Sequence, residues 1–468
     1  MSKGKNFIYF IIIVIIVAAF IYIYPEIEWH SPEVNIKLES EYIGLRPFEI
    51  EVKDKGKGLK KLSISLVDEN GETTLLDKVY TSPVKEDKIT LELDPKKLGI
   101  KDGPAELRIS AEDRSRLKLF FGNKTKISKK VKLDLTAPKA EMISTEHNLN
   151  HGGSGLVIYK ASDDTSKSGV IAGVYFFPAF KGYFKDPNVY MSFFAYPFDI
   201  SSEQGLSIVA EDEAGNSKVI NVPHKLKNIR YRKSNINISE NFIEQRMYPL
   251  LDSDESEDED LKIIFLKVNR DLRKENNEQI KEIGEKSSAQ IMWNGAFHQL
   301  SNSKVESNFA DDRTYYYENQ PIDQQYHLGY DLAVTKRYPV EVANDGVVIF
   351  VGDLGIYGNT IIVDHGMGIT TLYGHLSTTD VNKGDRVKKK QIIGRTGQTG
   401  LAAGDHLHYG VYINGIAVRP IEWWDSKWIN DNIINKIKQA KIEFGNADNA
   451  GDQSKDENSQ ENSTSQVN

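Results

Sequence analysis

Short runs in which apolar and polar residues alternate recur along this chain, and they constrain its fold more than any other feature. Residues 31–135 contain FEIEVKD, KLSISLVDE, ITLELD and AELRISAED, each separated from the next by turn residues. When apolar and polar residues alternate with a period of two, one face of the strand points towards a core and the other points towards solvent. Several such strands at this spacing favour an antiparallel sandwich. We therefore expect a mostly β chain.

A short internal repeat predicts a second module of the same kind. LRISAED at 107–113 is echoed by LSIVAED at 206–212, and the second copy continues with EAGN and another alternating run. A strand, an Asp-centred turn with Gly-Asn and a further strand would form a hairpin near the end of each copy. This resembles the closing hairpin of bacterial immunoglobulin-like domains. We expect two Ig-like β-sandwich modules, at 31–135 and 136–224, that act as spacers or bind other cell-envelope proteins.

An unbroken apolar run, FIYFIIIVIIVAAFIYIY, occupies residues 7–24. A helix of this length would measure about 27 Å, close to the thickness of a bilayer core. Lys3 and Lys5 precede the run, so the positive-inside rule keeps residues 1–6 in the cytoplasm. A cleaved signal peptide is the main alternative, but bulky residues follow the two alanines of the run. We predict an uncleaved, single-pass transmembrane anchor in the bacterial cytoplasmic (inner) membrane, with the rest of the chain on the periplasmic or cell-wall side.

Two segments have the composition of a linker and of a tail. Residues 225–290 combine helical patterns with the acidic run DSDESEDED at 252–260, and Ser239 is a candidate helix cap. Calcium binding by the acidic run is one hypothesis, but the run lacks the glycine and closing glutamate of a calcium loop, which favours a solvated linker. Residues 446–468 are rich in Asn, Ser, Gln and acids and are expected to be disordered.

Charge and cysteine content exclude several functions. The net charge is -8, from 59 basic and 67 acidic residues, which argues against binding of nucleic acid through phosphate contacts. The chain has no cysteine, so it has no disulfides, no thiolate metal site and no cysteine nucleophile. Any metal must be held by His, Asp or Glu.

Histidines are concentrated in a glycine-dense, strand-like segment at 291–425. Three clusters stand out, HLGYD at 327–331, YGHLS at 373–377 and HLH at 406–408. Because alternate side chains of a strand share a face, the two histidines of HLH point the same way. Two imidazoles, a carboxylate and an open position are what catalytic zinc requires. Taken singly, each cluster could be surface, loop or core residues; their joint presence indicates a site.

Residues 305–425 resemble the lysostaphin-type, or LytM-like, zinc metalloendopeptidases that cut peptidoglycan peptides. VESNFADDRTYY, HLGYDLAV, PVEVANDGVVIFVG, GNTIIVDHGMGITTLYGHLS, VNKGDRVKKKQIIGRTGQTG and GDHLHYGVYINGIAVRP follow in the family's order. The resemblance implies an antiparallel β peptidase domain, duplicated-hybrid-motif-like, at 291–445. One departure is Ala310, where the family usually has glycine.

The resemblance also implies the roles of individual residues. His327, Asp331 and His408 match the zinc ligands, and His375 and His406 match the catalytic pair beside the metal. Which of the two is the general base stays open. His365 matches a structural position, and His298 lies ahead of the motifs; neither is assigned to the site.

The sequence thus predicts a membrane-anchored zinc metalloendopeptidase that hydrolyses peptide stems or cross-links of bacterial peptidoglycan. One alternative is a non-enzymatic protein that binds the cell wall or activates another hydrolase. Another is a zinc carboxypeptidase that removes terminal D-Ala. The residues do not specify which bond is cut.

Overall fold

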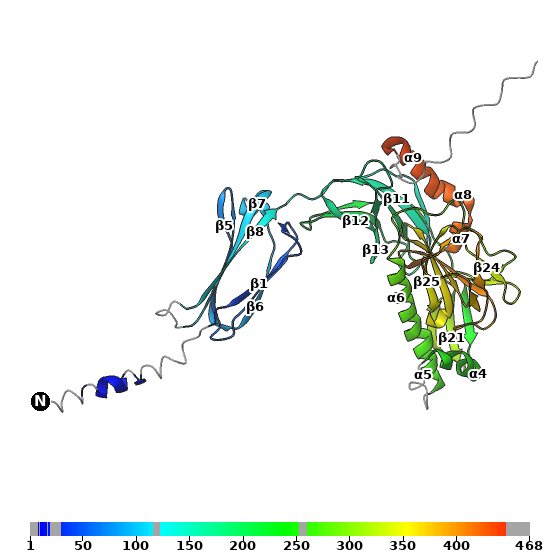
Figure 1. Ribbon diagram of the computed structural model, residues 1–468, viewed down its shortest axis with the longest axis horizontal. Helices are drawn as coiled ribbons and strands as arrows, with labels where there is room; N and C mark the ends of the chain where they lie inside the picture. Colours follow the sequence, from blue (N-terminus) through cyan, green and yellow to red (C-terminus); the bar gives the residue numbers. More distant parts are fainter. Residues whose placement is uncertain are drawn as a thin grey trace, which may run out of the picture. The chain divides into compact units, whose positions relative to one another are not determined.

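The computed structural model describes residues 8, 10–15, 17–18, 30–115, 122–251 and 260–445 (Figure 1). Strands predominate among these residues, as the alternating patterns predict. The chain divides into two compact units. The first comprises Met1–Pro138 with Asp164–Ser166 and Glu211–Lys218, and the second comprises Lys139–Asp163, Lys167–Ala210 and Val219–Asn468.

The predicted transmembrane helix at 7–24 requires a correction. Of the helices in the described residues, none combines the length and the apolar character needed to cross a membrane. Residues 7, 9, 16 and 19–24 of this run lie outside the described residues. The membrane-spanning part of the predicted fold is therefore wrong, and so is the single-pass inner-membrane localisation that depended on it.

The first unit contains two sheets around one core. Three antiparallel strands form the smaller sheet, in the order β1 (Glu33–Lys37), β3 (Phe48–Lys53), β6 (Glu86–Leu91). Five strands form the larger sheet, in the order β2 (Tyr42–Ile43), β8 (Lys124–Leu133), β7 (Gly103–Asp113), β4 (Leu59–Asp68), β5 (Gly71–Val84). The short helix α2 (Pro95–Leu98) connects β6 to β7. Ile50, Ile64 and Ile109 alternate with exposed or half-buried residues and lie in the shared core, as a period of two requires.

Two further four-stranded sheets and a parallel pair follow in the chain; together we call strands β9 to β18 the second β module. One sheet has the order β14 (Phe180–Lys181), β15 (Val189–Ala195), β11 (Ser154–Ala161), β9 (Ala140–Met142). The other has the order β13 (Tyr175–Pro178), β12 (Thr165–Ala172), β16 (Leu206–Asp212), β17 (Ser217–Asn221). β10 (His147–Asn150) pairs with β18 (His224–Lys227). Whether either β module is Ig-like remains a prediction.

A mainly helical segment leads to the histidine-rich region. It contains β19 (Lys233–Asn237), α4 (Glu240–Phe242), η2 (Ile243–Met247), η3 (Tyr248–Leu250), α5 (Leu261–Leu266), η5 (Lys267–Leu272) and α6 (Arg273–Gly284). Ser239 caps α4 by accepting a hydrogen bond from the backbone N–H of Phe242, which confirms the predicted helix start. The last three elements form one continuous helical stretch at 261–284. Most of the acidic run, residues 252–259, lies outside the described residues, as does the tail at 446–468.

An antiparallel sheet carries the histidine-rich region. Its order is β20 (Lys304–Ser307), β23 (Tyr330–Ala333), β31 (Leu407–Ile413), β27 (Ile369–Gly374), β26 (Asn359–Gly366), β25 (Gly346–Asp353), β29 (Arg386–Val387), and β32 (Ile416–Val418) also pairs with β31. Two small sheets accompany it. One has the strand order β19, β21 (Asp312–Tyr317), β22 (Gln320–Tyr326), and the other has the strand order β24 (Pro339–Glu341), β30 (Ile392–Arg395), β28 (Thr378–Thr379). The short helix η6 (Gly355–Tyr357) precedes β26.

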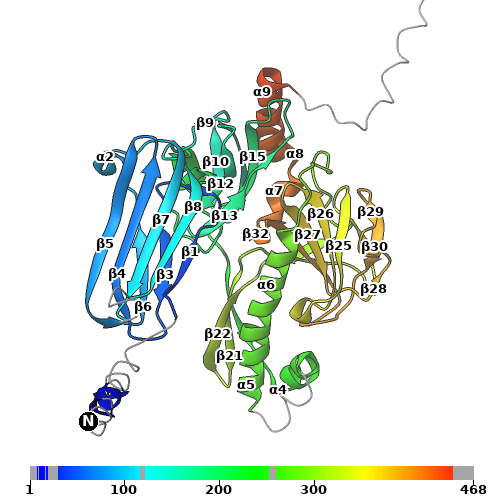
Figure 2. The ribbon, with the colours of Figure 1, turned by 60° about the vertical axis from the view of Figure 1, so that its left-hand side comes forward.

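Four helical elements end the described chain and join this sheet to the second β module. They are α7 (Pro420–Trp424), α8 (Ser426–Ile429), η7 (Asn430–Ile434) and α9 (Asn435–Phe444), and α9 contacts β11 (Figure 1). Figure 2 shows α7, α8 and α9 following one another beyond the sheet. Trp423 is fully buried, and its Nε1 donates a hydrogen bond to Ser154 Oγ at 3.1 Å. One hydrophobic core runs through both parts. The boundaries at 136–224, 225–290 and 291–445 stay predictions.

Candidate active site

Strand pairing brings the predicted site residues together. Asp331 on β23 lies directly opposite His408 on β31, and Gly374 at the end of β27 lies opposite His408 on its other side. Residues paired across neighbouring antiparallel strands have Cα atoms about 5 Å apart. His375 follows β27 and His327 precedes β23, so each enters the same space from a strand end. The sheet therefore assembles a cluster from segments that are distant in sequence.

Three of these side chains form a compact group. His327 Nε2 lies 3.0 Å from Asp331 Oδ1 and 3.1 Å from His408 Nδ1. His408 Nδ1 lies 3.1 Å from Asp331 Oδ1. All three ligand atoms lie within 4.8 Å of one another, which is the arrangement that could hold a metal ion.

Hydrogen bonds at the back of the group suit a metal. His327 Nδ1 donates to the backbone carbonyl of Asn308 at 3.0 Å, which directs Nε2 at the group. Asp331 Oδ2 lies 3.4 Å from Arg313 Nη2, so its other oxygen faces the two imidazoles. Nitrogens of two imidazoles and a carboxylate oxygen are a donor set that zinc accepts. The residues present therefore fit a catalytic metal.

The electrostatics of the cluster follow from burial and close contact. Burial raises the pKa of Asp331, but the charge of His327 and hydrogen bonds from three imidazoles outweigh it and hold that pKa well below its usual range. Burial lowers the pKa of His408 to about 4 and that of His375 to about 3. For His406, burial lowers the pKa, but the hydrogen bond to Asp331 outweighs it and raises the pKa overall. Asp331 is thus held as a carboxylate, ready to act as a ligand.

The remaining two predicted residues lie beside this group. The ring centroids of His375 and His406 are 4.8 Å apart. His375 Nδ1 donates to the carbonyl of Thr399, and His406 Nδ1 donates to the carbonyl of Gly404, both at 2.8 Å. The Nε2 atom of His375 is therefore available for proton transfer, whereas Nε2 of His406 hydrogen-bonds to Asp331. His406 Nε2 is 3.4 Å from Asp331 Oδ1.

The backbone at His375 is unusual. Its φ of 63° lies in the left-handed region, which costs a non-glycine residue about 1–3 kcal/mol and persists only where surrounding structure enforces it. Here the backbone N–H of His375 donates to the carbonyl of Tyr357 at 2.7 Å. This contact helps to hold the imidazole at the cluster.

All five residues line one cavity of about 660 Å³. Its walls come from the sheet, from Arg313 and Tyr315 on β21, and from β19 and α4, which contribute Asn235 and Phe242. β19 pairs in parallel with β21, which fixes this wall to the histidine-rich region.

Sequence reasoning assigned no role to three residues that support the site. Asn308 orients His327, Arg313 contacts Asp331, and the ring of Tyr357 lies 5.2 Å from that of His408. Asn308 and Arg313 lie within the motif VESNFADDRTYY, which was a usable signal. Tyr357 carries no comparable signal, because its role depends on the position of η6.

Two other histidines and one departure from the family pattern also have structural explanations. His365 is buried and bonded to the carbonyl of Asp345 and to Thr371, and His298 lies 3.0 Å from Glu341 Oε2. Ala310 has a φ of 58°, in the left-handed region that glycine occupies without strain. This accounts for the usual glycine at that position.

Comparison with known proteins shows which family the histidine-rich region is similar to. Residues 325–420 match the model of Peptidase family M23. The DD-carboxypeptidase/endopeptidase Mpg of Neisseria meningitidis is 42% identical over 95 residues, which are 20% of this chain and 22% of that protein. The peptidoglycan DD-endopeptidase ShyA of Vibrio cholerae is 35% identical over 120 residues, 25% of this chain and 26% of that protein. The chain thus spans about a quarter or less of these curated relatives.

A solved structure is also similar to part of this chain. The catalytic domain of the antimicrobial peptidase lysostaphin from Staphylococcus simulans is 28% identical, and the match covers 26% of this chain and 92% of that one, with a TM-score of 0.23.

Proposed function

We propose that the lysostaphin-type, or LytM-like, peptidase domain that includes residues 325–420 is a zinc metalloendopeptidase acting on the peptide stems or cross-links of peptidoglycan. The observation that carries the proposal is the convergence of a His-Asp-His group and two further histidines in one cavity. One curated relative is named as a DD-carboxypeptidase/endopeptidase and another as a peptidoglycan DD-endopeptidase, which supports the same substrate class.

In this proposal His327, Asp331 and His408 hold the metal. Zinc bound there would polarise a scissile carbonyl and lower the pKa of a water molecule towards neutrality. His375 and His406 each direct an Nε2 atom at the cavity, with Nδ1 committed to a backbone carbonyl. One of them would accept the proton of the attacking water, and the other would stabilise the developing oxyanion or protonate the leaving amine.

The test is digestion of purified peptidoglycan by the full chain, followed by separation of the muropeptides. We expect cross-linked dimers to be converted into monomers, a chelator to abolish the conversion, and added zinc to restore it. His375→Ala should slow hydrolysis by about 100-fold or more while keeping bound zinc. Hydrolysis that persists in the chelator, or that is not slowed in His375→Ala, would refute the mechanism.

A carboxypeptidase is the second candidate, because the Neisseria relative is named as both a carboxypeptidase and an endopeptidase. Release of a single terminal D-Ala from a defined monomeric muropeptide would identify this activity. The remaining alternative is a non-enzymatic wall-binding or hydrolase-activating protein, whose cellular phenotype should tolerate His375→Ala. Binding of other envelope proteins by the two β modules also remains a prediction.

A further inference from the structure

Most of the carboxylates that line the cavity of the candidate active site are engaged by other groups. The described residues that supply these carboxylates are Glu306, Asp311, Asp331 and Asp405. Asp331 contacts Arg313 and three imidazoles. Asp405 accepts a hydrogen bond from the hydroxyl of Thr396 at 2.6 Å. Asp311 is buried and accepts a hydrogen bond from a backbone N–H at 3.1 Å.

Glu306 differs from the other three because it is exposed and unengaged. Its carboxylate accepts no hydrogen bond and forms no ion pair with any residue that the structure describes. Its charge nevertheless acts on the candidate site. Burial lowers the pKa of His406, whereas the hydrogen bond to Asp331 and the charges of Asp331 and Glu306 raise it. A carboxylate left unpaired on a substrate cavity is available to a cationic group of the ligand.

A β-bulge accounts for the position of Glu306 on this cavity. Val305 pairs with Leu332, and Ser307 pairs with Asp331. Two steps along β20 thus match one step along β23, and Glu306 is the extra residue. Consecutive side chains of a regular strand point to opposite faces, yet Glu306 and Ser307 both line the cavity. Bulges are over-represented next to active sites, where they redirect a side chain in this way.

Glu306 also lies close to the proposed metal group. Because Ser307 is paired with Asp331, their Cα atoms are about 5 Å apart, and the Cα of Glu306 is about 3.8 Å from that of Ser307. The Cα atoms of Glu306 and Asp331 are therefore within about 9 Å of each other. An extended peptide covers that distance in about three residues. A group that Glu306 recognises thus belongs to a substrate residue near the bond that is cut.

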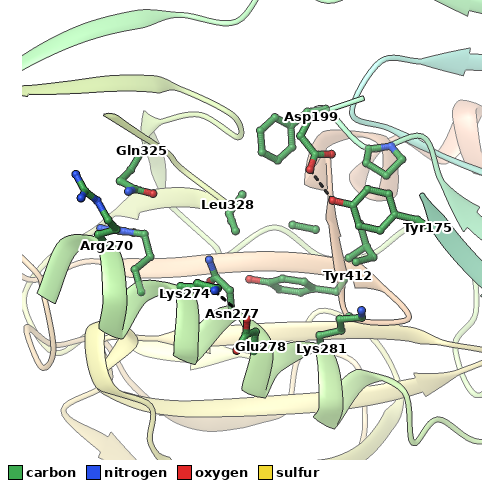
Figure 3. Close-up of a pocket in the computed structure, with 16 residues that line it drawn as sticks. Tyr175, Asp199, Arg270, Lys274, Asn277, Glu278, Lys281, Gln325, Leu328 and Tyr412 are labelled. Atoms are coloured by element: carbon green, nitrogen blue, oxygen red, sulfur yellow. Dashed lines mark hydrogen bonds and ion pairs between the residues drawn. The ribbon is translucent and has the colours of Figure 1, made fainter. Parts of the chain in front are cut away.

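The neighbouring cavity along α6, of about 390 Å³, offers no comparable group among the described residues (Figure 3). Its two carboxylates are both engaged. Asp199 accepts a hydrogen bond from the hydroxyl of Tyr175, and Glu278 lies 3.9 Å from Lys274. Within the part of the chain that the structure describes, Glu306 is therefore the one carboxylate on either cavity that has no partner.

We propose that Glu306 is a specificity-determining residue that binds a primary ammonium of the substrate peptide, within about three residues of the bond that is cut. The ammonium donates a charge-assisted hydrogen bond to the carboxylate. The inference rests on the proposed function, because peptidoglycan stems carry a diamino acid whose second amino group is an ammonium wherever it is not cross-linked. It adds that the enzyme prefers stems with this ammonium over stems in which the amine is acylated.

The test compares the binding of two peptides to the full chain as purified. The first is N-acetyl-L-Ala-γ-D-Glu-L-Lys-D-Ala, and the second carries an additional acetyl group on the side-chain amine of its lysine. The two peptides share every carboxylate, so coordination by a bound metal contributes equally to both. We expect the peptide with the free ammonium to bind about tenfold more tightly, as one hydrogen bond between charged groups predicts.

Three variants locate the preference. Glu306→Gln keeps the shape of the side chain without its charge and should abolish the preference, whereas Glu306→Asp keeps the charge and should retain part of it. Glu282→Gln, at an exposed glutamate of α6 that does not line the cavity, is the matched control and should retain all of it. Because Glu306 is exposed on an edge strand, its replacement should leave the fold intact.

Equal binding of the two peptides by the unsubstituted chain would overturn the inference, and so would a preference that persists in Glu306→Gln. A third contrary result is an equal loss of kcat on free and acetylated substrates in Glu306→Gln, which would assign the carboxylate to the reaction instead of to recognition. The outcome is separable from the test of the proposed function. A preference that depends on Glu306 in a chain that hydrolyses nothing supports the ammonium site and refutes the enzyme, whereas hydrolysis without any preference does the reverse.

Discussion

The hydroxyl of Tyr357 donates a hydrogen bond of 2.9 Å to Oδ1 of Asn277, and the ring of the same tyrosine lies 5.2 Å from the ring of His408. Asn277 belongs to α6, which lies outside the segment 325–420 that matches the peptidase family. A helix from the preceding region thus supports the loop behind the candidate metal site. The carbonyl of Tyr357 also accepts the backbone N–H of His375.

Removing that hydroxyl should weaken both the fold and the activity. We expect Tyr357→Phe to lower the free energy of unfolding by about 1 kcal/mol, the usual net value of one hydrogen bond. Loss of support behind the ligands should lower kcat/KM about tenfold, at the lower end of the effects seen for groups that orient metal ligands. Tyr338→Phe makes the same chemical change at a tyrosine that contacts Asn302 away from the site, and should leave kcat/KM unchanged. Equal effects of the two substitutions would contradict the prediction.

Zinc retention should depend on the three proposed ligands and not on histidine content in general. We expect the purified chain to hold one zinc ion, and His327→Ala to hold almost none after dialysis, because two ligands bind zinc much more weakly than three. His298→Ala removes a half-buried histidine outside the cluster and should retain full zinc. Elemental analysis measures the zinc content of the three proteins. A full zinc complement in His327→Ala would exclude the group of His327, Asp331 and His408 as the zinc site.

The two histidines beside the group should affect turnover without affecting metal content. His375→Gln and His406→Gln should each lower kcat by about 100-fold or more, the range expected for loss of a general acid or base. Zinc content should stay at the level of the unsubstituted chain. Single-turnover kinetics on a defined cross-linked muropeptide measure the effect. A variant that loses its zinc together with its activity would instead indicate a role in binding the metal.

A buried glutamate should make stability depend on pH. Burial raises the pKa of Glu422 to about 7, against hydrogen bonds from Asn150 and Ser154 and the charge of Arg419, which lower it. The folded chain therefore binds a proton that the unfolded chain releases between pH 4.5 and 7, so stability falls as pH rises through that window. The full effect is about 3 kcal/mol.

Denaturant unfolding at several pH values tests this expectation. In Glu422→Gln, whose side chain stays uncharged, most of the fall in the free energy of unfolding between pH 5 and 7 should disappear. Glu282→Gln, at an exposed position on α6, should show the same fall as the unsubstituted chain. A slope that is the same in all three proteins would show that Glu422 is ionised in the folded chain throughout.

The local sequence pattern predicted those features of the candidate site that depend on residues within a single segment. The spacing of His406 and His408 places both on one face of a strand, and both reach Asp331 in the structure. The pairing of β23 with β31, which brings His408 opposite Asp331, is not encoded locally, because strands distant in sequence form it. The alternating runs likewise predicted a mostly β chain, but not which strands are neighbours.

Other features had no sequence signal, or a misleading one. Asn276 and Asn277 lie in a polar run that looks like an ordinary solvated helix face, yet their side chains bond to the loop around Tyr357. The apolar run at 7–24 predicted a membrane-spanning helix because hydropathy reports the preference of side chains for an apolar environment. No helix among the described residues is both long and apolar enough to span a membrane.

The burial of Trp423 against Ser154 has a consequence for how such a chain can evolve. The helices that end the peptidase region also complete the core of the second β module. Recombination that moved the peptidase region alone into another protein would expose this tryptophan in the product and leave a hole in the donor. The two parts should therefore be inherited together, as a single exchangeable piece.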